Sequence, residues 1–194
     1  MLLRNRASQI EAHSADAARG FEHIDSSAVA VINWLNSNRI DFVLVGPVAN
    51  AIRGDTSARG PVAIVPAPYG RNLDRLARAL TAAHARLRPA SSRATPPDLP
   101  TETVAVKLDA DKLLRSDRWP LRCGEHDLDI EGRSARSSRY QELLYEAARF
   151  ELAPEVSVEV AAPEDIEHYE HVRRTGVEPE LTVRRVANAP NHLS

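Results

Sequence analysis

The amino-acid sequence predicts an α/β (α+β) protein with a mixed central sheet flanked by helices. Two unbroken apolar runs, Phe42 to Val45 and Val62 to Val65, have the length and composition of buried strands. Helical patterns stand before, between and after these runs. The second half of the chain adds short strand patterns, two of which are spaced as a hairpin. Strands followed by helices, with hairpins later, predict one mixed sheet covered by helices.

The first half of the chain supplies two helices and the two buried strands. After a polar arm, residues 1–25, Ser26 or Ser27 is expected to cap a helix. A short helix between the strands covers residues 48–52. The apolar positions of the first helix share one face: Ala28, Val31, Ile32 and Leu35. A longer helix follows the second strand, with a stripe made of Leu73, Leu76, Ala77, Leu80 and Leu87.

The second half begins with a stretch rich in proline and serine, Arg88 to Glu102, which is predicted to be a surface loop. Pro163, followed by two acidic residues, is a favourable start for the last helix. A further helix contains Tyr140, Leu143, Leu144 and Ala147. The predicted strands are 103–108, 118–123, 127–132, 149–152 and 156–161, the last two forming a hairpin. We therefore expect one domain, residues 26–186, and a tail, residues 187–194.

Composition limits the classes of function. The formal net charge of -2 lacks the basic excess of general nucleic-acid binders. Cys123 is the only cysteine, which excludes an intramolecular disulfide and any multi-cysteine metal site. No apolar run approaches the roughly 20 residues of a membrane span. These features predict a cytoplasmic protein without a membrane partner.

The order of elements and several short strings resemble the nucleotidyltransferase superfamily of the DNA polymerase beta type, especially its small bacterial branch that includes abortive-infection toxins. The strings are F-V-L-V-G, D-L-D-I and P-E-D-I, within residues 26–176. This resemblance implies a nucleotidyltransferase-like fold. It also implies a Gly-Gly or Gly-Ser turn that holds nucleotide phosphates, and three aspartates that bind magnesium. Alternate residues of a strand lie about 6 to 7 Å apart on one face, close enough to hold two cations against a triphosphate.

At the nucleotide turn, this sequence departs from the family pattern. Gly46 matches the first turn glycine and is the expected nucleotide-binding residue. Pro47 stands where the second glycine or serine would be, and proline has no amide hydrogen for a phosphate. The family's lysine in the helix after the hairpin is matched by Glu170, which has the opposite charge.

The metal positions depart further. Pro61 and Ala63 fall on the two aspartates of the family's Asp-x-Asp pair, whereas Asp129 matches the third aspartate. Changes in the groups that merely support metal ligands cost about 10- to 100-fold in metal affinity or activity, so the loss of two ligands should cost more. We therefore expect a degenerate metal site without a bound metal or cofactor. Asp129 is predicted to lie near Ala63, on a strand next to the two buried strands.

A second candidate metal site is formed by Asp127, Asp129 and Glu131, which alternate along one predicted strand. Alternation places these three carboxylates on one face and Leu128 and Ile130 on the core side. The alternative interpretation is the solvated face of an edge strand on which Asp127 and Asp129 are vestigial.

Other side chains suggest weaker possibilities. His168 and His171 are three residues apart on a predicted helix, but the sequence offers no third metal ligand nearby. Cys123 has the features of a small buried apolar residue rather than a nucleophile. Two arginine-rich stretches, Arg115 to Arg122 and Gly132 to Arg139, could follow an RNA backbone or could be ordinary surface arginines.

The combined prediction is a nucleotidyltransferase-fold protein with a degenerate metal site that binds a nucleotide, an RNA or a protein partner without catalysis. One alternative is an active, magnesium-dependent nucleotidyltransferase, toxin-like in kind, that uses Asp127, Asp129 and Glu131. The other is a purely structural or assembly subunit that keeps the fold alone.

Overall fold

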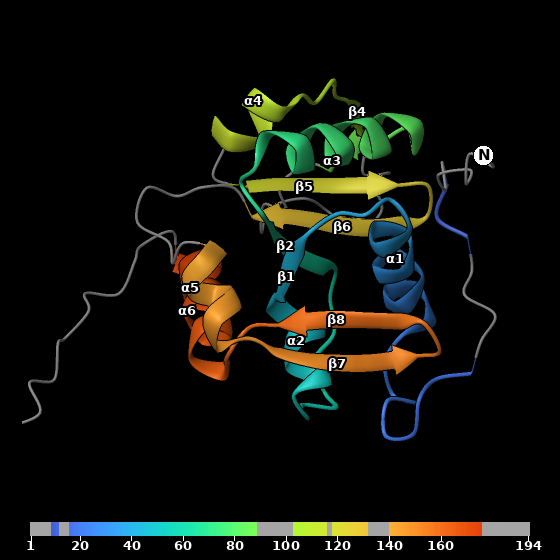
Figure 1. The fold of residues 1–194 in the computed structure, drawn as a ribbon, viewed down its shortest axis with the longest axis vertical. Coiled ribbons are helices and arrows are strands. Elements are labelled where there is room, and N and C mark those ends of the chain that lie inside the picture. The colour runs from blue at the N-terminus through green and yellow to red at the C-terminus, as the bar shows by residue number, and fades with distance from the viewer. Residues whose placement is uncertain (1–8, 12–15, 89–102, 116–117, 132–139, 176–194) are drawn as a thin grey trace, which may run out of the picture.

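A computed structural model describes residues 9–11, 16–88, 103–115, 118–131 and 140–175. Over these residues the chain is an α/β protein with a mixed eight-stranded sheet and six helices (Figure 1). The predicted mixed sheet flanked by helices is confirmed at this level. The predicted tail, residues 187–194, lies outside the described residues, as do residues 176–186 of the predicted domain.

The centre of the sheet is formed by the two apolar runs. β1 (Phe42–Val45) is buried at every position and pairs antiparallel with β2 (Val62–Pro66). β2 pairs in parallel with β6 (His126–Glu131), and β1 pairs in parallel with β8 (Val156–Val160). Apolar side chains at every position of β1 suit a strand covered on both faces.

The register places the candidate residues side by side. Val45 is the Cα partner of Ala63 across β1 and β2, and Ala63 is the partner of Asp129 across β2 and β6. The prediction that Asp129 lies near Ala63 on a neighbouring strand is therefore confirmed.

The outer strands correct two predictions. The order in the sheet is β4-β3-β5-β6-β2-β1-β8-β7, so β6 is an interior strand and not an edge strand. β5 (Arg118–Cys123) and β7 (Ala148–Ala153) form the antiparallel hairpins with β6 and β8. β3 (Arg86–Leu87) and β4 (Val104–Ala105) complete the sheet, and of the strand predicted over 103–108 only these two residues of β4 pair.

The helices largely follow the sequence pattern and differ from it at their ends. Ala147 lies beyond the last residue of α5, Glu146, and the short helix predicted over 48–52 begins at Gly46. The cap of α1 is Asp25, whose side chain accepts from the backbone N–H of Ser27 at 2.7 Å, and not Ser26 or Ser27. α3 ends at Ala82, and Leu87 belongs to β3 rather than to the apolar stripe of this helix. The helices are α1 (Ser26–Ser37), α2 (Gly46–Ile52), α3 (Gly70–Ala82), α4 (Ala110–Arg115), α5 (Tyr140–Glu146) and α6 (Pro163–Thr175).

The helices sit around the twisted sheet on different sides. In the view of Figure 1, α1 and the pair α5 and α6 lie on opposite sides of β1 and β2, and α3 and α4 lie beyond β5. Among the helices described, none has the length and apolar character needed to cross a membrane.

The core contains one buried charge among the described residues. Its large buried side chains include Trp34, Ile64 and Leu128. Asn38 and Asn72 are buried polar residues, and both hydrogen-bond to backbone groups. Asp129 is a buried carboxylate with 0% exposure. Because an isolated carboxylate is very costly to bury, the surroundings of Asp129 must supply countercharge.

Candidate functional site

The site starts from the alternation of β6. Asp127, Asp129 and Glu131 occupy every second position, whereas Leu128 and Ile130 are fully buried in the apolar core. A period of two places the three carboxylates on one face of the sheet. They lie on the face opposite the two core residues, as the sequence predicts.

The neighbouring strand β5 brings arginines to the same face. Arg118 is the Cα partner of Glu131, Pro120 is the partner of Asp129, and Arg122 is the partner of Asp127. Directly paired residues of antiparallel strands share a face, so the period of two also places Arg118 and Arg122 beside the carboxylates. The Nε and Nη2 atoms of Arg122 donate to Asp127 at 2.8 and 3.1 Å.

Arg88, the residue after β3, lies beside Pro120 of β5. Its backbone N–H donates to the carbonyl of Pro120 at 2.9 Å, which continues the pairing of β3 with β5. Its guanidinium donates from Nη1 to Asp127 at 3.1 Å and from Nη2 to Asp129. Pro120 has neither a charge nor a hydrogen-bonding side chain, so Arg88 supplies the countercharge at this point.

α6 contributes the fourth arginine. The Nη2 atom of Arg173 donates to Oδ2 of Asp129 at 2.9 Å, and Arg118 donates to the same oxygen. Asp129 therefore accepts hydrogen bonds from three guanidinium groups, those of Arg88, Arg118 and Arg173. We call the set Arg88, Arg118, Arg122, Arg173, Asp127, Asp129 and Glu131 the arginine cluster. Its four cations face three carboxylates.

The turn after β1 lies against this cluster. Gly46 has a φ of +71°, and a Cβ built on it would lie 3.0 Å from Cβ of Ala63 and 3.9 Å from Nη1 of Arg173. Glycine is therefore required both by the backbone conformation and by the close approach of β2. Pro47 follows at the start of α2. Of the two positions that the resemblance assigns to a nucleotide, Gly46 thus adjoins Ala63 and Arg173, whereas Pro47 lies against Gly60.

Glu170 does not join the cluster. Its Oε1 accepts from the side-chain amide of Asn50 at 2.8 Å, which ties α6 to α2. The position that the resemblance assigns to a lysine therefore carries a carboxylate engaged in a contact between two helices.

The arginine cluster does not fit a divalent metal. Asp129 has three guanidinium partners, Asp127 has two, and Glu131 lies 3.5 Å from Nε of Arg118. Magnesium prefers carboxylate oxygens that are free to coordinate it. Within the part of the chain that the structure describes, no group of three or more His, Cys, Asp or Glu side chains is arranged to hold a metal ion.

Two members of the cluster have displaced pKa values. The hydrogen bonds to Asp127 raise the pKa of the Arg122 guanidinium, and the second shifted group is Glu131. Burial raises its pKa to about 7; the nearby charge of Arg118 lowers it and that of Asp129 raises it. The side chain is only 13% exposed. Protonation near neutral pH would therefore increase the positive charge of the cluster.

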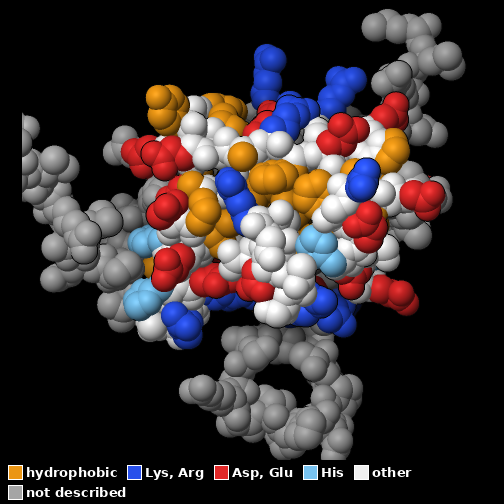
Figure 2. Space-filling model, turned by 90° about the horizontal axis from the view of Figure 1, so that it is seen from below, with side chains coloured by type: hydrophobic (Ala, Val, Ile, Leu, Met, Phe, Trp, Pro, Cys, Tyr) orange, Lys and Arg blue, Asp and Glu red, His pale blue; other side chains and the backbone are white. Residues whose placement is uncertain are grey.

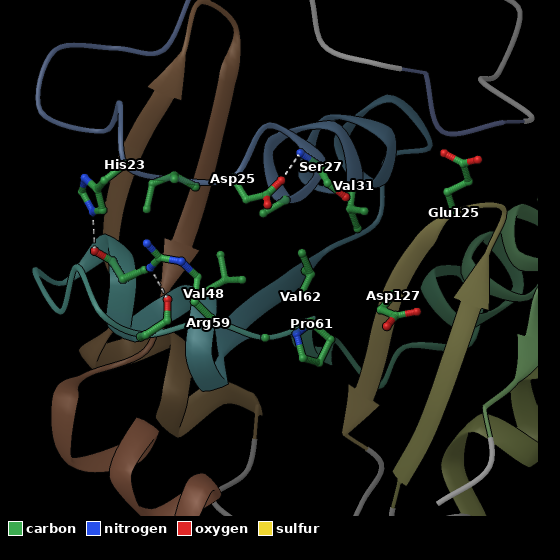
Figure 3. A pocket seen from close by; sticks show the side chains of 15 residues that line it. His23, Asp25, Ser27, Val31, Val48, Arg59, Pro61, Val62, Glu125 and Asp127 are labelled. Atoms are coloured by element: carbon green, nitrogen blue, oxygen red, sulfur yellow. Dashed lines mark hydrogen bonds between the residues drawn. The ribbon is translucent and has the colours of Figure 1, made fainter. Parts of the chain in front are cut away.

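A cavity of about 360 Å³ adjoins the cluster between α1, α2, the start of β2 and the turn between β5 and β6 (Figure 3). Asp127 belongs to both the cavity wall and the cluster. The other charged lining groups include Asp25, Glu125 and Arg59, and Arg59 donates to the carbonyls of Thr56 and Ala58 at 2.7 and 2.8 Å. Its lining carries more carboxylates than arginines, so the cavity disfavours anions.

The remaining candidates are not brought into this site. Cys123 is buried and burial raises the pKa of its thiol to about 12, which leaves it without thiolate character at neutral pH. His168 and His171 lie on α6, and the metal search over the described residues that found no site includes both of them. Residues 132–139 lie outside the described residues.

Two arginines of the site were not expected from the sequence. Arg88 stands at the start of the predicted loop. Arg173 stands near the end of the last predicted helix, which is recognised in the sequence by its first residues, Pro163 and the two acidic residues after it. The alternation of Arg118 and Arg122 beside the D-L-D-I string was a signal that these arginines pair with the carboxylates. Arg88 and Arg173 reach the site only through the pairing of β3 with β5 and the packing of α6.

Comparison with known proteins adds no identity. No family model matches the chain, and no curated protein matches it.

Proposed function

We propose that this chain is a nucleotidyltransferase-fold protein with a degenerate metal site that binds a nucleotide, an RNA or a protein partner without catalysing transfer. The arrangement of β1, the turn at Gly46, β2 and the parallel strand that carries Asp129 supports this proposal. It has the order of elements that the resemblance implies. The resemblance assigns the position of Ala63 to a metal-binding aspartate, and Ala63 is the Cα partner of Asp129.

One observation carries the proposal: three guanidinium groups hydrogen-bond to the buried Asp129. A divalent cation at this carboxylate would have to displace arginines and would be repelled by those that remain, in a partly buried environment where charges interact strongly. Arginine remains protonated at any physiological pH, so the repulsion cannot be relieved by proton loss. The catalytic alternative needs Asp127, Asp129 and Glu131 to coordinate metal while arginines hold them.

Metal-dependent stabilisation and nucleotide transfer test this proposal. Thermal unfolding is followed with magnesium or manganese, and labelled nucleoside triphosphates are incubated with the protein and candidate acceptors in parallel. We expect no metal-dependent shift in the unfolding temperature and no transfer. Magnesium stabilisation that Asp129→Asn abolishes, accompanied by transfer of label, would overturn the proposal in favour of the active enzyme.

A further inference from the structure

A second cavity, of about 430 Å³, lies at the end of β1 opposite to the arginine cluster. The last turn of α1, the start of β1, the first residue of α5 and the β7–β8 hairpin surround it. Asp41, just before β1, lines this cavity, whereas Gly46 follows the other end of the strand. Its apolar lining consists of Ile40, Phe42 and Val158. The volume is within the range of roughly 300 to 1,000 Å³ that is typical of small-molecule sites.

Tyr140 is a buried polar residue in the wall of this cavity. It is 9% exposed, and its ring packs edge to face against Tyr69 with 6.3 Å between the ring centroids. Burial raises the pKa of Tyr140 to about 12, and the nearby charges of Asp41 and Glu159 act in the same direction, so the hydroxyl keeps its proton at neutral pH. Within the part of the chain that the structure describes, this hydroxyl has no hydrogen-bond partner. A buried tyrosine hydroxyl normally has one, so Tyr140 has a donor to offer a ligand.

The charged side chains of the cavity divide into paired and unpaired groups. Asp41 accepts from an arginine of α3 at 3.1 Å, and Glu159 accepts from Arg149 at 3.3 Å. Arg39, after α1, and Glu155, between β7 and β8, also line the cavity. Neither has an ion pair or a side-chain hydrogen bond with another described residue. The cavity therefore offers one unpaired cation, one unpaired carboxylate and one unpaired hydroxyl.

From this lining we propose that the cavity binds a small zwitterion with an ammonium and a carboxylate group, the chemistry of free amino acids and short peptides. The guanidinium of Arg39 binds the carboxylate, since its planar fork matches the two carboxylate oxygens. The hydroxyl of Tyr140 donates to the same carboxylate, and Glu155 accepts from the ammonium. The apolar lining contacts the hydrocarbon part of the ligand. This site goes beyond the proposed function and does not depend on it.

A small zwitterion fits the charges better than a nucleic acid does. The lining carries two arginines and three carboxylates, which gives a formal charge of 2 − 3 = −1. A polyanion is therefore disfavoured, whereas a ligand that carries both charges is neutral overall. On the face shown in Figure 2, acidic and basic side chains are interspersed around an apolar centre, without a continuous basic track. Binding of an RNA backbone over many nucleotides would need such a track.

The experiment measures binding of each proteinogenic amino acid, dialanine and trialanine by isothermal titration calorimetry. We expect at least one of these probes to bind, and the comparison of amino acids with peptides identifies which of the two is the ligand. The probe that binds best is then compared with its N-acetyl derivative, which lacks the ammonium, and with its C-terminal amide, which lacks the carboxylate. Each blocked derivative should bind about tenfold or more weakly, a change of about 1.4 kcal/mol.

Two variants assign the binding to this cavity. Arg39→Gln should weaken binding of the zwitterion about tenfold and leave binding of the amide unchanged, because the amide has no carboxylate for Arg39. Tyr140→Phe removes one hydroxyl and should also weaken binding of the zwitterion about tenfold, as expected for a hydrogen bond to a charged group. Arg78→Gln and Tyr145→Phe are the matched controls, since both residues are exposed and neither lines the cavity. Both controls should bind as the parent does.

Three results would overturn the inference. These are absence of binding by every probe, equal binding of the zwitterion and a blocked derivative, and unchanged binding in both Arg39→Gln and Tyr140→Phe. Because Arg39 is exposed, Arg39→Gln tests the site even if Tyr140→Phe does not fold. None of these results bears on the proposed lack of catalysis, which nucleotide transfer alone would contradict.

Discussion

Asp129 is a buried carboxylate whose charge is balanced by arginines from three parts of the chain. The resemblance assigns its position to a metal ligand, yet its two oxygens are bound by arginines from β5, α6 and the residue after β3. Breaking a buried ion pair by removing one partner typically costs about 3 to 5 kcal/mol, since it leaves an uncompensated charge. The carboxylate and its arginines therefore depend on one another for burial.

Glu131 gives a prediction for pH dependence. Its pKa in the folded protein is about 7, above the ordinary value of 4.5, so the folded state binds more protons than the unfolded state between these values. The free energy of unfolding therefore loses a contribution as pH rises through this window, by about 3 kcal/mol in total. Glu131→Gln should become more stable relative to the parent as pH rises from 5 to 8, as measured by urea unfolding.

Glu151→Gln, at an exposed position on β7, is the control for loss of one carboxylate from the surface. If the stability difference between Glu131→Gln and the parent stays constant from pH 5 to 8, burial does not displace the titration of Glu131.

At the scale of elements, the sequence predicts the positions of the strands along the chain better than it predicts which strands pair in the sheet. The apolar runs of β1 and β2 and the spacing of β7 and β8 are local signals, so the sequence predicted them. The place of β6 inside the sheet depends on pairing with β5 and β2, which no local pattern reveals. For the same reason the helical spacing of apolar residues in α3 predicts that Leu87 belongs to this helix. In the structure Leu87 lies in β3 and pairs with Leu121 in β5.

α6 provides a prediction at this scale. Two side-chain hydrogen bonds hold this helix, from Arg173 to Asp129 and from Asn50 to Glu170. The buried side chains of Ile166 and Tyr169 also hold it in place. A hydrogen bond to a charged group contributes about 1.5 to 3 kcal/mol. Arg173→Gln should therefore speed amide hydrogen exchange in α6 by about 10- to 100-fold, because each 1.4 kcal/mol of local stability is a factor of about ten.

Arg174→Gln, the neighbouring exposed position, should leave exchange in α6 close to that of the parent. α1, which has seven buried residues, is the reference helix, and its exchange should change much less than exchange in α6. Equal acceleration in both helices would mean that Arg173 stabilises the whole fold rather than docking α6.

At the scale of the whole molecule, the cluster joins parts of the chain that are distant in sequence. The start of β2, the strand β6 and the end of α6 meet at Ala63, Asp129 and Arg173. Two features therefore distinguish this site from the metal site that the resemblance implies: Pro61 and Ala63 have no carboxylates, and guanidinium groups are present from β5, α6 and the residue after β3. Restoring only the carboxylates leaves the repulsion of the arginines in place.

The last prediction separates these two causes. Pro61→Asp with Ala63→Asp returns two carboxylates near Asp129, and clustered carboxylates repel one another unless a cation lies among them. In the double variant, the four arginines of the cluster already supply that positive charge. Manganese should therefore raise the unfolding temperature of the double variant little. With Arg173→Gln added, one such cation is lost from beside Ala63, and manganese should raise the unfolding temperature because it binds only the folded state. Equal manganese stabilisation of both variants would show that the arginines do not exclude metal, whereas stabilisation confined to the triple variant would support their exclusion of it.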